Sequence, residues 1–185
     1  HRQHNAHVAT TFGRVLHKHT PLGNNLITIR RIQMGEAELF RQIRLMALQD
    51  APHAFPSTYD SALQRSAESW REQADRSAQG TDRATFIAFS DNIPVGMAAL
   101  YRHEDKLDEG ELLQVWVNSE HRGTRVIWDL MDMIFRWARE NNFRRIIAGV
   151  TKGNARAVKF YTKYGFILFE ESTEGVYLVK EVLLT

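Results

Sequence analysis

The chain of 185 residues contains no cysteine, so disulfide bonds, thiolate metal sites and a cysteine nucleophile are all excluded. No apolar run approaches the roughly 18 residues that cross a membrane, and no signal-peptide pattern stands at the start. The formal net charge is only +2, which gives no reason to expect a nucleic-acid partner. These absences favour a cytoplasmic protein that binds neither membranes nor nucleic acid.

The remaining composition is that of a globular protein, with 43% apolar and 25% charged residues. The length fits one domain with a sizeable core. The first 25 residues differ, because they hold five of the eight histidines and close with a turn-like Pro-Leu-Gly-Asn-Asn run. No carboxylate there completes a metal site. We therefore expect residues 1–25 to be a flexible extension, residues 26–185 to be the domain, and no metal centre.

Hydrophobic periodicity divides the domain into strands and helices. Strands are expected at 26–32, 84–89, 94–101, 111–117, 144–150, 166–170 and 176–183, and helices at 36–48, 59–79, 126–140 and 155–163. The order is β-α-α-β-β-β-α-β-α-β-β. It predicts an α/β fold in which a single domain holds a mixed sheet of about seven strands with helices on both faces.

Residues 111–117 read as the central strand, since they include two valines and a tryptophan and contain little charge. The polar run at 118–123 ends in a glycine, and helical spacing begins at Val126. A strand, a glycine-containing turn and a helix can form an anion site, because the first free N–H groups of the helix point into the turn. Arg122 and Arg125 add positive charge there. An ordinary strand–helix connection with solvated arginines fits the same residues.

Two motifs and the order of elements resemble the GNAT superfamily of acyl-CoA N-acyltransferases. Residues 117–123, Val-Asn-Ser-Glu-His-Arg-Gly, are similar to the family's run from its fourth strand into its phosphate loop. Residues 154–166 are close to the family's Asn-x-x-Ala-x-x-Phe-Tyr-x-x-x-Gly-Phe, which is the more specific motif. Residues 54–59, Ala-Phe-Pro-Ser-Thr-Tyr, are similar to the substrate-side loop of one bacterial-type branch.

The resemblance implies an acetyl-CoA site in a cleft where the parallel strands at 111–117 and 144–150 separate. Pantetheine would pair with the backbone of Val115, Trp116 and Val117. The remaining cofactor-binding residues would surround the pyrophosphate and comprise Arg122, Gly123, Thr124, Arg125, Val126 and Ile127. The chain departs from the family's Arg/Gln-x-x-Gly-x-Gly/Ala, because Arg125 and Ile127 stand where the family has small residues. Arg125 either narrows the phosphate site or pairs with phosphate.

Direct attack of an amine on a thioester requires a base for the amine and an acid for the leaving thiolate, but no nucleophile on the enzyme. The resemblance assigns the base to Glu111 and the acid to Tyr161. The alternative for Glu111 is a carboxylate in solvent. The alternative for Tyr161 is an aromatic that packs in the core. Both alternatives stay open at this point.

Other residues around this centre have two interpretations as well. Asn154 would contact pantetheine, cap its helix, or do both. The aromatic residues Phe55, Tyr59 and Tyr101 would line an acceptor pocket or belong to the core. The isolated His103 and His121 are expected at the surface.

Two functions from different classes remain open. One is an N-acetyltransferase that moves an acetyl group from acetyl-CoA to a primary amine of a small molecule or a protein. The other is a non-catalytic GNAT-fold protein that binds a ligand or partner with an altered phosphate loop. The acceptor is not identified, because the loops that select it are specific to each enzyme. A homodimer is compatible with either function.

Overall fold

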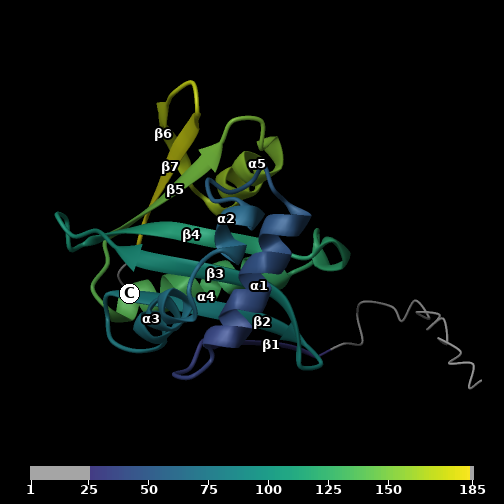
Figure 1. Cartoon of the computed structure of the whole chain (residues 1–185). Coiled ribbons are helices and arrows are strands. Elements are labelled where there is room, and N and C mark those ends of the chain that lie inside the picture. Colours follow the sequence, from purple (N-terminus) through teal and green to yellow (C-terminus); the bar gives the residue numbers. More distant parts are fainter. Residues whose placement is uncertain (1–25, 184–185) are drawn as a thin grey trace, which may run out of the picture.

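A computed structural model describes residues 26–183 of the chain (Figure 1). The strands are β1 (Ile27–Arg31), β2 (Arg83–Ser90), β3 (Ile93–Arg102), β4 (Glu109–Val117), β5 (Arg145–Thr151), β6 (Ile167–Glu171) and β7 (Gly175–Glu181). The helices are α1 (Ala37–Asp50), α2 (Tyr59–Leu63), α3 (Ala67–Ala78), α4 (Val126–Glu140) and α5 (Ala155–Tyr164), with a short 3-10 helix, η2, at Ser119–His121. The extension expected at 1–25 lies outside the described residues.

The strands form the single mixed sheet that the sequence predicts, and their order in it is β1-β2-β3-β4-β5-β7-β6. Strands β4 and β5 are parallel, and the other neighbouring pairs are antiparallel. The β2–β3 hairpin turns at Asp91 and Asn92, whose positive φ angles of 48° and 69° suit the tight turn that matches strand twist.

Helices cover both faces of the sheet, as expected (Figure 1). One face carries α1, α2 and α3, and the side chains buried there include Phe40, Ile43, Trp70, Met97 and Trp116. The other face carries α4 and α5, with Leu130, Met131, Ile134, Phe143 and Phe166 buried against the strands. Each such side chain contributes roughly 1.5–3 kcal/mol when fully buried, so these two layers hold the sheet in place.

The helix predicted at 59–79 is wrong in one respect, because it is two helices. Ser66 has an extended backbone, and its hydroxyl accepts a hydrogen bond from the Ser69 N–H at 3.1 Å. This cap starts α3 at Ala67 and separates it from α2, which ends at Leu63. No helix within residues 26–183 is long and apolar enough to cross a membrane.

Candidate active site

Strands β4 and β5 separate halfway along their length. They pair only over Glu109–Leu112 and Arg145–Ala148, although β5 continues to pair with β7 as far as Thr151. A bulge in β4 accompanies the separation: Gln114 has a φ angle of 58°, and the register with β3 shifts beside it. The opening between residues 113–117 of β4 and 149–151 of β5 is here called the fork, and it lies where the family resemblance implies the cofactor site; Figure 1 shows the two strands diverging.

The turn after β4 offers backbone N–H groups at one end of the fork. Asn118 caps η2 by accepting from the His121 N–H at 3.1 Å. Gly123 has a φ angle of 77°, and no heavy atom lies within 4 Å of where a Cβ would stand. Helix α4 then begins without a side-chain cap from Arg125, while the Val126 N–H is 3.4 Å from the Thr124 hydroxyl. Such a turn has room and donors for an anion.

The two arginines of this turn behave differently. The Arg122 guanidinium donates to the Val117 carbonyl at 3.2 Å and forms an ion pair with Asp50. The Arg125 side chain is 78% exposed and lies 3.6 Å from Asp129, so it points to solvent and leaves the turn open. The bulk of Ile127 packs against the core of the α4 face. Neither non-glycine residue of the altered loop therefore fills the space at Gly123.

The α1–α2 loop, residues 51–58, crosses the fork. Just before the loop, the carboxylate of Asp50 at the end of α1 accepts a hydrogen bond from the Trp116 indole N–H on β4 at 2.9 Å. Further along, the His53 carbonyl accepts from the Thr151 hydroxyl at the end of β5 at 2.8 Å. Half-buried Phe55 and Tyr59 pack on the α1–α3 face of the sheet. The loop therefore lies over the α1–α3 side of the fork.

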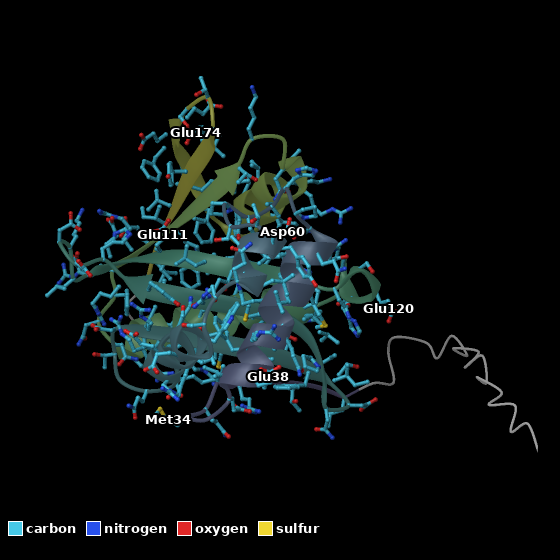
Figure 2. All side chains as sticks on the ribbon, in the orientation of Figure 1. Met34, Glu38, Asp60, Glu111, Glu120 and Glu174 are labelled. Carbon is cyan, nitrogen blue, oxygen red and sulfur yellow. The ribbon has the colours of Figure 1, made fainter. Side chains whose placement is uncertain are left out.

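Glu111 lies where the paired part of β4 ends, one residue before Leu112 (Figure 2). Its side chain is 37% exposed, and its Cα partner on β3 is Tyr101. Tyr101 faces the α1–α3 side, because its hydroxyl accepts from Gln73 on α3 at 3.0 Å. Side chains directly opposite each other in an antiparallel pair share a face, so Glu111 projects toward the same side.

His103 stands between two carboxylates. Its Nδ1 atom is 3.1 Å from a Glu109 oxygen, and its Nε2 atom is 3.7 Å from a Glu111 oxygen. Burial raises the pKa of Glu109, but the positive charges of Lys106 and His103 outweigh this, so the pKa lies below the ordinary value. His103 also lines a groove of about 610 Å³ on the β5–β7 side of the sheet.

The surface position expected for both histidines needs correction. His103 is half-buried in the array just described. His121 is buried in η2, where its Nδ1 atom is 2.7 Å from the Asn118 side-chain oxygen. The sequence held a signal for each histidine: Glu109 is close to His103 and Asn118 is close to His121, and each of these polar residues could have indicated a side-chain partner.

Tyr161 lies on the opposite face from Glu111. It is 7% exposed, and its ring packs against Phe160 and Phe166 at centroid distances of 5.5 and 5.2 Å. Burial raises the pKa of its hydroxyl well above the ordinary value, so the phenol stays protonated. Asn154 caps α5 by accepting from the Ala157 N–H at 3.3 Å, as expected. Tyr161 lies on α5, which follows β5 after a short turn.

Two residues of the site were not expected from the sequence. Gln114, which forms the bulge, is a polar residue inside an apolar run, and this interruption was a usable signal. No sequence signal pointed to Asp50, because its hydrogen-bond partner Trp116 is 66 positions away in the chain.

The sequence matches the family model of the acetyltransferase (GNAT) family over residues 45–166. No curated protein matches it significantly. Among solved structures, a GNAT-family acetyltransferase from Streptococcus pneumoniae is similar with a TM-score of 0.70 and 19% identity, covering 85% of this chain and 99% of that chain. The GNAT domain of S. lividans PAT has a TM-score of 0.69 and 19% identity, with 88% and 99% covered.

A third similar structure is PaiA N-acetyltransferase from Thermoplasma acidophilum in complex with coenzyme A. Its TM-score is 0.71 at 18% identity, with 84% of this chain and 99% of that chain covered. At these identities the structural likeness supports the fold. The family match spans well over half of the chain and includes the fork, the turn before α4 and all of α5. The chain therefore belongs to the GNAT family of acetyltransferases.

Proposed function

We propose that this protein is an N-acetyltransferase that moves an acetyl group from acetyl-CoA to a primary amine of a small molecule or a protein. The observation that carries the proposal is the fork, with the carboxylate of Glu111 where the two strands part. Coenzyme A bound to a neighbour of the same fold supports acetyl-CoA as the donor.

The backbone of the fork fits the donor. Residues Val115, Trp116 and Val117 have no β5 partner on their fork side, so their backbone can pair with the amides of pantetheine as an added strand would. The amides from Gly123 to Ile127 would bind the pyrophosphate, with charge supplied by Arg122 and Arg125. Asn154, at the start of α5, would contact the pantetheine arm while it caps the helix.

The reaction requires two proton transfers by residues of this chain. Acetyl-CoA supplies a thioester whose carbonyl carbon is open to attack by an amine. Glu111 would accept the proton of the substrate ammonium, and His103 would pass it toward Glu109 and solvent. As the new C–N bond forms and the C–S bond breaks, the nitrogen would lose its second proton by the same route, and Tyr161 would donate a hydrogen bond to the departing thiolate, whose conjugate thiol has an ordinary pKa of about 8.5.

One observation favours a non-catalytic GNAT-fold binding protein as the second candidate. Asp50 holds a negative charge against Arg122, close to the turn where pyrophosphate would bind. This negative charge opposes the binding of an anion in that turn. In that case the fold would bind a ligand or partner without turnover.

Thiol release from acetyl-CoA with a panel of primary amines tests the proposal. Replacement Glu111→Gln is expected to lower kcat/KM about 10²–10⁴-fold at neutral pH, the usual range for loss of a general base. Glu120→Gln is the matched control, because this glutamate is exposed on η2 at a distance from Glu111 (Figure 2). Binding of acetyl-CoA without thiol release for any amine would favour the non-catalytic alternative.

A further inference from the structure

Arg44 is a cation inside the layer between α1 and the sheet. It belongs to the buried stripe of α1 together with Phe40, Ile43, Ala47 and Leu48, and it is only 7% exposed. Its guanidinium lies over the ring of Phe55, 5.0 Å from the centroid. The Nη1 atom is enclosed and has no hydrogen-bond partner among residues 26–183.

No carboxylate of the described chain balances this charge. Within residues 26–183, no ion pair involves Arg44, and the charged and titratable groups that act on it are Tyr101 and the second cation Arg65. Residues 1–25 contain no Asp or Glu that could supply one. Burial lowers the pKa of Arg44 to about 10, so the guanidinium is still charged at neutral pH. Leaving a buried cation unpaired is unfavourable, and a bound anion would remove that cost.

Tyr101 connects this cation to the proposed base. It is the Cα partner of Glu111. The Arg83 guanidinium lies 4.1 Å from its ring centroid, and Tyr101 interacts electrostatically with both Arg44 and Arg65. Arg65 itself rests on the Trp70 ring at 3.8 Å and donates to the Ser69 hydroxyl and carbonyl at 3.0 and 3.2 Å, but it forms no ion pair in the described chain.

We infer that Arg44 and Arg65 form an anion subsite for the acceptor, so that the acetylated molecule is an amine that also carries a carboxylate. A guanidinium group can bind a carboxylate through two parallel hydrogen bonds, and the charge of Arg44 has no ion-pair partner within residues 26–183. With its carboxylate held there, the molecule would present its amino group along Tyr101 to Glu111. The inference rests on the proposed function, and it specifies the acceptor class.

The test compares free amino acids with their carboxamides, which keep the amine and remove the anion. In thiol-release assays with acetyl-CoA, kcat/KM is expected to be at least about tenfold higher for the amino acids, a difference of about 1.4 kcal/mol. Replacement Arg44→Gln should abolish this preference, mainly by raising KM for the amino acid, while KM for acetyl-CoA stays unchanged. Arg44→Lys should restore part of it. Arg41→Gln, on the same helix but outside its buried stripe, is the matched control.

Equal kcat/KM for amino acids and carboxamides would overturn the inference, as would a preference that survives Arg44→Gln. Coenzyme A binding checks that each variant is folded, and Arg44→Met provides a second variant of similar length. If no amine releases thiol, the proposed function fails separately. Thermal unfolding then tests the anion subsite independently: amino acids should raise Tm of the wild type and not of Arg44→Gln. If amino acids do not raise Tm of the wild type, the anion subsite is refuted.

Discussion

The indole N–H of Trp116 on β4 donates a hydrogen bond to the carboxylate of Asp50, the last residue of α1, at 2.9 Å. The same carboxylate oxygen binds the guanidinium of Arg122. One side chain thus ties α1, the end of β4 and the turn before α4 together. It also neutralises a cation that the proposed pyrophosphate site would use.

Replacement Asp50→Asn keeps an acceptor for the Trp116 indole and removes the negative charge. We expect Kd for acetyl-CoA to fall about fivefold, or about 1 kcal/mol, with a steeper dependence on salt because Arg122 then pairs with phosphate. Calorimetric titration at two salt concentrations measures both effects. Asp60→Asn on α2, whose carboxylate is exposed, is the control. A weaker affinity in Asp50→Asn would mean that Asp50 acts by positioning Arg122.

Replacement Tyr161→Phe keeps the ring and its packing but removes the hydroxyl. We expect kcat to fall about 10²–10⁴-fold when chemistry limits the rate, with Kd for acetyl-CoA little changed. Single-turnover thiol release separates the chemical step from product release. Tyr164→Phe is the control, because that hydroxyl is bonded to Asp132 at 2.7 Å and its loss should affect stability. A wild-type chemical rate in Tyr161→Phe would assign Tyr161 to the core alone.

Replacement Arg125→Gly restores the family's glycine. Because the Arg125 side chain is exposed and only weakly held by Asp129, it is free to turn toward a bound phosphate. We therefore expect Kd for acetyl-CoA to rise about fivefold and its salt dependence to weaken. Tighter binding in the glycine variant would show instead that the arginine obstructs the site. Asp129→Asn should leave or improve the affinity, since it releases Arg125.

The turn between β1 and α1 predicts a dependence of stability on pH. Glu36 accepts two hydrogen bonds from the Arg30 guanidinium, at 2.7 and 2.9 Å, and these lower the pKa of Glu36. A lowered carboxyl pKa stabilises the fold above the ordinary pKa of about 4.3, and the contribution is lost as pH falls through the folded value. Urea unfolding should show Glu36→Gln about 0.5–1 kcal/mol less stable at pH 7, a modest value because the pair is partly exposed.

The difference between Glu36→Gln and the wild type should shrink toward zero near pH 3. Glu38→Gln, whose exposed carboxylate lies 3.5 Å from Arg41, should change stability little at either pH. A constant difference at both pH values would mean that the Glu36 charge is not the cause.

Sequence patterns predicted the strands and most helices closely, because apolar alternation and helical spacing depend on local backbone geometry. The inward residues of α1 were predicted less well. The apolar residues at helical spacing in this segment include Leu39, Phe40, Ile43, Leu45 and Met46, whereas the buried set is Phe40, Ile43, Arg44, Ala47 and Leu48. The charge of Arg44 suggested an exposed position. Arg44 is four positions from both Phe40 and Leu48, so the helical spacing places it in the buried stripe.

The fork followed from the family resemblance, since no local pattern requires two parallel strands to separate. Contacts between distant segments could not be predicted in this way. The bond between Trp116 and Asp50, and that between Thr151 and His53, depend on how α1 and the following loop pack over the sheet. The catalytic assignments of Glu111 and Tyr161, the acetyl-CoA site and the acceptor pocket stay predictions.

Calorimetric titration of the full chain with acetyl-CoA tests the central claim, that the fork is an acetyl-CoA site, most directly. We expect saturable binding of one molecule per chain, together with thermal stabilisation of about 2.7 kcal/mol when acetyl-CoA is present at about 100 times its Kd. No heat of binding and no rise in Tm with millimolar acetyl-CoA would contradict the account.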